Sequence, residues 1–236
     1  MPDNRARTAV FGASGRLGKE IAELMIRDAR FVAGPWIAHP KSRFIGQTLF
    51  NQVVISTKDS HEADLYIDAS IAQGFEERLE IALRRKKPIA IGTTGLNASQ
   101  KALLSEASRT IPLLYTPNFS LGMALLKTLA QDVARKFYPD AAIDLIEMHH
   151  AQKKDAPSGS ALLLSDAIRN EGHREIAIHS IRSGTIPGTH EILFNTPEES
   201  IRLIHSAYSR AAFAKGALQA AHFLLSQPPG LYTSWI

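Results

Sequence analysis

Residues 8–18, TAVFGASGRLG, join a short apolar run to a helical pattern through a turn rich in glycine. The apolar run at 8–11 predicts a β-strand, and the spacing of Leu17, Ile21 and Leu24 predicts an amphipathic helix directly after it. A strand followed at once by a helix is the unit from which parallel sheets are built. The start of the chain therefore predicts an α/β domain.

The turn has the pattern G-x-x-G-x-x-G, formed by Gly12, Gly15 and Gly18. Glycines let the backbone turn tightly and approach a pyrophosphate, and the N-terminus of the helix adds free N–H groups. We expect this turn to bind a dinucleotide; the alternative is a plain glycine-rich turn. The residues expected to contact the cofactor here are Gly12, Ala13, Ser14, Gly15, Arg16 and Leu17.

The alternation of strand and helix continues over the first 118 residues. Strands are predicted at 31–37 (interrupted by Pro35), 65–67, 89–91 and 113–115, and helices around 75–83 and 103–107. Repeated alternation requires crossover connections and gives a parallel sheet covered on both faces.

The pattern changes near residue 120. Helices are predicted at 121–137 and 160–168, and extended segments at 142–148, 176–181, 191–194 and 201–207. Because the last three extended segments follow one another without helices, we expect a mixed or antiparallel sheet with one face on a helix or a partner subunit. A final helix at about 209–225 could return to the first domain.

Two later turns also follow predicted strands. Ligands of parallel sheets bind outside the carboxyl ends of the strands, so we expect both turns to line the same crevice as the glycine turn. Ordinary turn chemistry is the alternative for each. The residues concerned are Gly92, Thr93 and Thr94 after one strand and Thr116, Pro117, Asn118 and Phe119 after the next.

The end of the second strand bears on the choice of cofactor. Enzymes that use NAD commonly place an acid there for the ribose hydroxyls, and no acid stands near Ala38. His39 and Lys41 follow instead, and cations suit the 2′-phosphate of NADP. We therefore expect NADPH, with NADH as the second choice; an exposed basic loop is the alternative.

Residues 147–161, EMHHAQKKDAPSGSA, hold the densest group of reactive side chains. His149 and His150 close a predicted strand, and Lys153 follows in the next turn. Residues 158–160 begin a helix with hydroxyls and free N–H groups, which suits a carboxylate, while histidine and lysine add proton donors.

Three other interpretations of this segment remain. Paired histidines bind metals in some proteins, but no third ligand stands at a familiar spacing, so we expect no metal site. A serine–lysine hydrolase lacks support because the chain has no G-x-S-x-G elbow. An ordinary loop before a capped helix also fits, since Pro157 and Ser158 are both good residues for a helix start.

Composition narrows the function classes. The chain has 236 residues, 44% hydrophobic and 21% charged, which is typical of a folded protein with a sizeable core. Its lack of cysteine excludes disulfide scaffolds, thiol nucleophiles and cysteine-ligated metals. The net charge of +4 is spread along the chain and suits small anionic molecules better than nucleic acid. No secretory segment or membrane-spanning run is evident, so we expect a cytoplasmic protein without membrane contact.

With these motifs in hand, the chain resembles the dihydrodipicolinate reductase (4-hydroxy-tetrahydrodipicolinate reductase) family of bacterial lysine and diaminopimelate synthesis. Residues 147–161 resemble the family block E-x-H-H-x-x-K-x-D-A-P-S-G-T-A, with Ser160 in place of threonine. The segments GASGRLG, IGTTG, PNFSLG, RSGTIPGTH and SRAAFAKGA resemble further family blocks in the same order. The resemblance covers nearly the whole chain, although the chain looks short for the family and has Ala38–His39 where an acid–arginine pair is common.

The resemblance implies an α/β fold with two domains. A Rossmann-like parallel-sheet domain, residues 1–120 plus 209–236, would bind the dinucleotide. A second α+β domain, residues 121–208, built on an open mixed sheet, would bind a dicarboxylate substrate and form a homotetramer. The reaction implied is hydride transfer from NAD(P)H to 4-hydroxy-tetrahydrodipicolinate with loss of water.

The resemblance also implies residue roles. His149 would be the catalytic acid or base and Lys153 the proton donor. The residues implied to hold the substrate are Thr94, His150, Ser158, Gly159 and Ser160. Two other classes stay open: a related NADP-dependent dehydrogenase of an amino acid, and a redox-sensing protein that binds the cofactor without chemistry.

Overall fold

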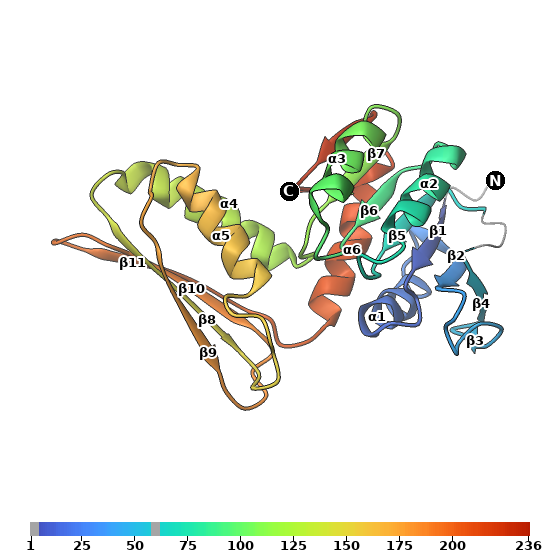
Figure 1. The fold of residues 1–236 in the computed structure, drawn as a ribbon, viewed down its shortest axis with the longest axis horizontal. Helices are drawn as coiled ribbons and strands as arrows, with labels where there is room; N and C mark the ends of the chain where they lie inside the picture. Colours follow the sequence, from blue (N-terminus) through green and yellow to red (C-terminus); the bar gives the residue numbers. More distant parts are fainter. Residues whose placement is uncertain (1–4, 58–61) are drawn as a thin grey trace. The chain divides into compact units, whose positions relative to one another are not determined.

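The computed structural model describes residues 5–57 and 62–236 and falls into two compact units (Figure 1). The first unit contains the chain up to Ser120 and the later segment Phe213–Trp235. The second unit contains Leu121–Ala212 together with Ile236. No helix among the described residues has the length and apolar character needed to span a bilayer.

The first unit is built on a sheet of eight strands in the order β12-β7-β6-β5-β1-β2-β4-β3. The strands are β1 (Ala6–Phe11), β2 (Phe31–Ala38), β3 (Thr48–Leu49), β4 (Gln52–Ser56), β5 (Leu65–Asp68), β6 (Ile89–Ile91), β7 (Pro112–Tyr115) and β12 (Gly230–Tyr232). All neighbours are parallel except β3 and β4. The predicted parallel α/β sheet is confirmed. The chain reverses its direction of travel across the sheet between β1 and β5, which is where such sheets bind ligands.

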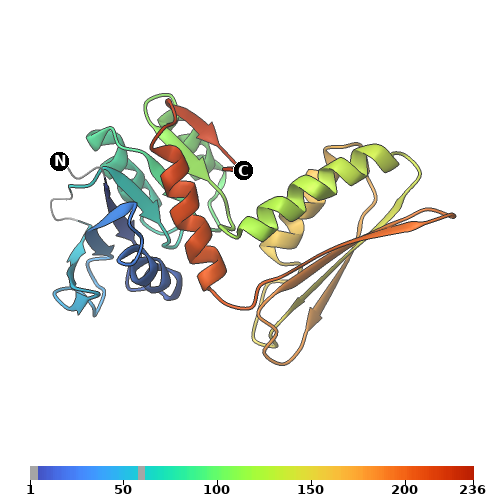
Figure 2. The ribbon, with the colours of Figure 1, turned by 180° about the vertical axis from the view of Figure 1, so that it is seen from behind.

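Helices cover both faces of this sheet, as the alternation predicted. They are α1 (Arg16–Met25), α2 (Phe75–Arg85), α3 (Ala98–Ala107) and α6 (Ala211–Leu224). Val10 of β1 joins the core shared with α1 and α6, whereas Ala9 and Phe11 join the core shared with α2 and α3. In Figure 1 helices α2 and α3 lie in front of the sheet, and in Figure 2, seen from behind, α6 lies on the other face.

Strand β2 runs unbroken through Pro35, which corrects the interruption expected from the sequence. The pairing with β1 jumps from Thr8–Ala33 to Val10–Trp36, so Gly34 and Pro35 form a bulge opposite one residue. A bulge leaves its extra residue out of the ladder, which accommodates a proline that has no N–H to donate.

Strands β3, β4 and β12 were not predicted from the sequence. β3 contains only two residues, too few for a periodic pattern, and β12 begins with a glycine and lacks an apolar run. β4 and β12 join the sheet through long-range pairing with β2 and β7, respectively, which a local pattern does not reveal.

The second unit is a four-stranded mixed sheet with two helices on one face, and the predicted mixed sheet is confirmed. Its elements are α4 (Leu121–Phe137), β8 (Ala142–His149), α5 (Gly159–Arg169), β9 (Ala177–Arg182), β10 (Thr189–Asn195) and β11 (Ser200–Ser206). The order is β11-β10-β8-β9, with β8 and β9 parallel and the other pairs antiparallel. Helices α4 and α5 lie on one face, and Figure 2 shows no element of this unit on the other.

Candidate active site

The helix-covered face of β8 changes from apolar to polar along the strand. Alternation places Ile143, Leu145, Glu147 and His149 on the same face, and all four are buried. The first two pack in the core with α4 and α5. Glu147 and His149 lie on the same face nearer the carboxyl end of β8, where they place a carboxylate and an imidazole in positions that apolar side chains occupy earlier in the strand.

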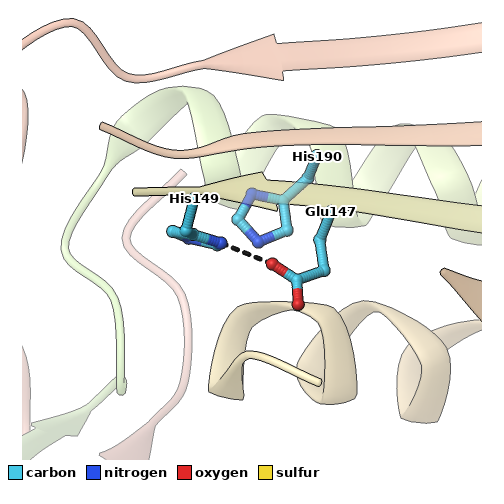
Figure 3. Close-up of side chains that lie close together, drawn as sticks. All are labelled: Glu147, His149 and His190. Atoms are coloured by element: carbon cyan, nitrogen blue, oxygen red, sulfur yellow. Dashed lines mark hydrogen bonds and ion pairs between the residues drawn. The ribbon is translucent and has the colours of Figure 1, made fainter. Parts of the chain in front are cut away.

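The pairing register brings polar partners to this pair from both neighbouring strands. Glu147 lies opposite His190 of β10, and His149 lies opposite Arg182 of β9. Figure 3 shows Glu147, His149 and His190 gathered on one side of the sheet, with the His190 ring beside the other two side chains. Four residues from three strands therefore form one cluster.

Glu147 is the centre of this cluster. Arg182 donates from Nη1 to Oε2 (2.9 Å) and from Nη2 to Oε1 (2.6 Å), and the backbone N–H of Ser158 donates to Oε1 (3.2 Å). Oε2 of Glu147 also contacts Nδ1 of His149 (Figure 3). Burial opposes ionisation, but hydrogen bonds from Arg182, Ser180 and His149 outweigh it and lower the pKa of Glu147 to about 2.

His149 is buried with one ring nitrogen on this carboxylate. Nδ1 of His149 is the ring nitrogen that meets this carboxylate. Burial lowers the pKa of His149, the charge of Glu147 raises it, and Lys153 and Arg182 lower it again. Gly188 adjoins the other nitrogen: a Cβ there would lie 3.1 Å from Nε2.

His190 is a neutral partner in the cluster. Its Nε2 lies 3.1 Å from the hydroxyl of Ser158, and its ring meets that of His149 edge-on at a centroid distance of 5.2 Å. Burial, followed by the nearby charge of His149, lowers the pKa of His190 to about 4. The cluster thus holds a neutral His190 beside the ion pair of Glu147 and Arg182 at neutral pH.

The helix start after the cluster is formed as expected. Ser158 is the N-cap of α5 and accepts a hydrogen bond from the N–H of Ala161 (3.2 Å). Gly159 is exposed and has open space where a Cβ would stand, and its backbone N–H donates a hydrogen bond to the Asp155 carboxylate. Ser160 is half-buried in the same turn. This end of α5 suits a carboxylate.

Lys153 and His150 lie beside this helix start. Lys153 forms an ion pair with Asp155 at 2.8 Å, and its charge is felt by His149. His150 follows the last residue of β8 and is half-buried, with Nδ1 buried and without a hydrogen-bond partner. Of the residues implied to hold the substrate, His150, Ser158, Gly159 and Ser160 belong to the second unit and Thr94 to the first.

Glu147, His149 and His190 also have the composition of a metal site. One ligand atom from each lies within 4.8 Å of the others. The paired histidines considered from the sequence are not the group that forms, because His190 and Glu147 join His149 instead. Both oxygens of Glu147 already accept hydrogen bonds from the Arg182 guanidinium, whose positive charge opposes a cation there. The chemistry of the cluster therefore favours proton handling over metal binding.

In the first unit, the glycine turn occupies the end of β1 and the start of α1. Gly12 has φ +77°, and a Cβ there would lie 2.8 Å from the carbonyl oxygen of Ala69. A Cβ at Gly18 would lie 2.1 Å from the oxygen of Gly12. The N-cap of α1 is Gly15, which has no side chain to cap the helix. The first N–H groups of α1 are therefore left for an anion.

The two later turns lie at the same edge of the sheet, after β6 and β7. A Cβ at Gly92 would lie 2.2 Å from the ring of Phe119, so the two turns touch. Thr116 and Asn118 fix the second turn by a hydrogen bond from the Thr116 hydroxyl to the Asn118 carbonyl (2.9 Å). Thr93 is buried and Thr94 exposed. Pro117 belongs to the same short connection.

The basic residues expected near a ribose follow the end of β2. The strand ends at Ala38, and His39 and Lys41 are exposed directly beyond it. The backbone N–H of Lys41 donates to Nδ1 of His39 (3.2 Å), which folds the two into one tight turn.

Three members of the cluster received no role from the sequence: Glu147, Arg182 and His190. Glu147 and His149 stand at positions of β8 that alternation assigns to the core, and a charged residue at such a position is a signal of function. Arg182 and His190 are the first and last residues of the segment RSGTIPGTH, which resembles a family block, but only the pairing with β8 shows that they meet Glu147 and His149.

Comparison with known proteins covers both units. A family model described as dihydrodipicolinate reductase, N-terminus, matches residues 6–119, and one described as dihydrodipicolinate reductase, C-terminus, matches residues 122–234. A 4-hydroxy-tetrahydrodipicolinate reductase of Xanthomonas campestris pv. campestris (strain B100) is 38% identical over 233 residues, covering 98% of this chain and 97% of the relative. Another relative of that name, from Caldanaerobacter subterraneus subsp. tengcongensis, is 38% identical over 248 residues, covering 96% of each chain. A chain of this length thus has relatives that match it from end to end.

Among solved structures, a dipicolinate-bound dihydrodipicolinate reductase from Paenisporosarcina sp. TG-14 has a similar fold. The TM-score is 0.81, with 23% sequence identity, and the match covers 97% of this chain and 98% of that one.

Proposed function

The chain belongs to the dihydrodipicolinate reductase family, and we infer from this that it reduces 4-hydroxy-tetrahydrodipicolinate, with loss of water, to tetrahydrodipicolinate in lysine and diaminopimelate biosynthesis. It is an oxidoreductase dependent on a nicotinamide cofactor, NAD(P)H. The observation that carries this conclusion is the match of both units to one family over almost the whole chain.

The turn at 12–18 supports cofactor binding in the first unit. Side chains at Gly12 and Gly18 would meet backbone atoms, so the turn stays close to the helix and keeps its amides accessible. Because α1 has no side-chain cap, its N-terminus suits a pyrophosphate. We propose that residues 12–17, 92–94 and 116–119 bind the cofactor.

We propose that the cofactor is NADPH rather than NADH. The support is the absence of an acid at Ala38, where β2 ends, and the exposed residues His39 and Lys41 just beyond it. Cations stabilise the 2′-phosphate that distinguishes NADP from NAD.

The second unit would hold and protonate the substrate. A carboxylate of the substrate would bind at the start of α5, at Gly159 and Ser160, with Thr94 and His150 as further contacts. The dipicolinate carried by the Paenisporosarcina relative is a dicarboxylate of this chemical kind.

The chemistry divides between hydride and proton. The reduced nicotinamide supplies the hydride to the cyclic imine that forms when water leaves the hydroxylated ring. Negative charge then grows on the ring, and Lys153 and protonated His149 are the groups able to deliver a proton to it. Asp155 orients the Lys153 ammonium, which lies 2.8 Å from its carboxylate.

We also propose that the enzyme is a cytoplasmic homotetramer, as the resemblance implies. The support within the chain is the uncovered face of the second sheet. There Ile181 and Ile204 are 43% and 58% exposed, on the side away from α4 and α5.

The assay that tests the function uses freshly generated 4-hydroxy-tetrahydrodipicolinate and follows the loss of absorbance from NADPH and NADH separately. We expect turnover with both and a clear advantage for NADPH. In Lys41→Ala the KM for NADPH should rise while that for NADH stays unchanged. Equal rates with NADPH and NADH would contradict the proposal that His39 and Lys41 favour NADPH. A folded protein that binds the cofactor without any turnover would contradict the function and favour a redox-sensing role.

A further inference from the structure

The carboxylate of Glu147 makes more contacts than any other group in the cluster, yet the roles proposed above leave it unused. It is fully buried at the carboxyl end of β8, two residues before His149. Its two oxygens accept hydrogen bonds from Arg182, from the N–H of Ser158 and from His149. A buried charge is costly unless it is paired, so this arrangement needs an explanation beyond packing.

We propose that Glu147, held in place by Arg182, is a positioning residue that fixes the orientation and tautomer of His149, so that the proton rests on Nδ1 and Nε2 is the nitrogen that exchanges protons during reduction. Glu147 acts through His149, and Arg182 acts through Glu147. The kinetic part of this inference rests on the proposed function, whereas the tautomer does not.

Glu147 carries its negative charge at neutral pH. Arg182 donates to both oxygens at 2.6 and 2.9 Å, which is the two-point geometry in which guanidinium and carboxylate bind most strongly. The pKa of Glu147 is lowered to about 2 by these bonds in spite of burial, so the group is ionised at neutral pH. An ionised carboxylate has no proton to give, and His149 must donate to it.

The sheet fixes the positions of Glu147, His149 and Arg182 relative to one another. Glu147 and His149 lie two residues apart on one strand, so their side chains point the same way and the contact to Nδ1 is local (Figure 3). Arg182 stands opposite His149 on β9, across parallel strands whose spacing the sheet fixes. Nε2 of His149 is turned to Gly188, where the lack of a side chain leaves room beside the ring.

The charged groups around His149 shift its pKa in opposite directions. The groups that act on His149 are Glu147 on its own strand, Arg182 on β9, His190 on β10 and Lys153 in the following loop. Of these only Glu147 is negative, and it raises the pKa of His149 against burial and the two cations. His190 is neutral at pH 7 because its pKa lies at about 4. Replacing Glu147 with an uncharged residue must therefore lower the pKa of His149.

The direct test is the tautomer of His149 by 15N NMR of histidine-labelled protein, with its signals assigned by the loss seen in His149→Gln. Above the pKa of His149, the wild-type protein should show a protonated Nδ1 and an unprotonated Nε2. In Glu147→Gln, where the amide no longer demands a donor, Nε2 should become protonated in part of the molecules. A wild-type His149 protonated on Nε2 would overturn the proposal whether or not the protein turns over.

The kinetic test compares the same variant with a matched control. In Glu147→Gln, kcat should fall about 10²-fold, the range expected when proton transfer is impaired, with KM changed by less than about threefold. Protonated His149 acts as the donor, so activity falls as pH rises through its pKa, and this limb should move to lower pH in the variant. Glu171→Gln, which removes a second carboxylate–arginine pair on the surface of the same unit, should leave kcat and the pH profile unchanged.

Arg182→Lys provides a second variant if Glu147→Gln does not fold. It keeps the positive charge but loses the two-point contact, so kcat should fall less than in Glu147→Gln, with the pH limb close to its wild-type position. Unchanged kcat and pH profiles in the folded variants would overturn the proposal. Absence of turnover in the wild type would contradict the proposed function instead, and the NMR result would still decide the tautomer.

Discussion

Two adjacent histidines, His149 and His150, have very different surroundings because strand geometry separates them. His149 ends β8 on the buried face, where Glu147 and Arg182 control its charge. His150 lies just past the strand and is half-buried. The sequence drew attention to the pair, but only the alternation of β8 shows which of them belongs to the buried cluster.

Lys153 is proposed as a proton donor. Its replacement should therefore slow the chemical step and leave cofactor binding unchanged. Lys153→Ala should lower kcat by about 10²-fold or more, since a positioned acid contributes that much. The Kd for NADPH should stay the same, because the proposed cofactor residues belong to the first unit and Lys153 to the second. Steady-state kinetics and fluorescence titration with NADPH measure the two quantities.

The neighbouring Lys154 provides the control, because it is exposed and carries the same charge. Lys154→Ala should keep nearly the wild-type kcat. Equal losses of kcat and of NADPH affinity in Lys153→Ala would contradict its role as a proton donor.

Acid should destabilise the folded protein in two steps, which follow from His190 and Glu147. The pKa of His190 falls from 6.5 to about 4 on folding, so the unfolded chain takes up this proton first and stability is lost from about pH 6.5 down to 4. The pKa of Glu147 falls from 4.5 to about 2, so its contribution is present above pH 4.5 and is lost between about 4.5 and 2.

The first step can be isolated by measuring Tm from pH 7.5 to 4.5. His190→Gln should lower Tm at pH 7.5, because the contact with Ser158 is altered, but should flatten its fall with decreasing pH. His179→Gln, which changes an exposed histidine on β9, should retain the wild-type slope. The same slope in His190→Gln would show that another group governs acid stability.

At the scale of single elements, helices α1 and α5 each have a glycine in the first turn, for different reasons. Replacing each glycine with alanine distinguishes the two reasons. In α1, a Cβ at Gly18 would lie 2.1 Å from the Gly12 oxygen, so Gly18→Ala must displace backbone. In α5, Gly159 has open space around the position of a Cβ. Gly18→Ala should lower the free energy of unfolding by about 2 kcal/mol or more.

Gly159→Ala should leave stability unchanged or slightly raised, because alanine favours helices over glycine. The KM for the substrate should rise in this variant, since the methyl group occupies the space proposed for a carboxylate. Thermal unfolding and the reductase assay test both statements. A fully stable Gly18→Ala protein would contradict the close packing of Gly18 against Gly12. An unchanged substrate KM in Gly159→Ala would contradict the proposed binding of a carboxylate at Gly159.

Elements with a repeating pattern could be predicted from the sequence, and elements that depend on distant pairing could not. The helix at 121–137 was predicted with the bounds that α4 has, because its apolar spacing extends over many turns. The unbroken β2 was not, because the bulge at Gly34 and Pro35 depends on the register with β1. In the site, His149 and Ser158 stood in one informative segment and Arg182 and His190 in another, RSGTIPGTH, but only the sheet pairing shows that the two segments meet.

At the scale of the whole molecule, the second sheet has one covered and one open face. The open face carries Ile181 and Ile204 beside charged residues such as Glu191 and Arg202. Ile181 lies on edge strand β9 and Ile204 on edge strand β11, so exposed apolar side chains stand at both edges of the open face. The proposed tetramer would bury this face.

Replacing Ile204 with glutamate should therefore break the assembly, because it places a charge in an apolar contact. Sedimentation velocity should show a tetramer for the wild type and smaller species for Ile204→Glu, with circular dichroism showing that the fold is kept. Ile26→Glu, an exposed isoleucine at the end of α1 in the first unit, is the control and should remain tetrameric. A wild-type monomer would contradict the proposed tetramer.

Hydride transfer from the nicotinamide to the substrate ring is the central step of the proposed function, and it can be followed with an isotope. The enzyme is given freshly generated 4-hydroxy-tetrahydrodipicolinate and NADPH deuterated at the transferring position of its nicotinamide, and the product is analysed by mass spectrometry. We predict one carbon-bound deuterium in each tetrahydrodipicolinate molecule, with the label lost from the cofactor. A product without deuterium, or a cofactor that keeps its label in the presence of folded enzyme, would contradict the assignment.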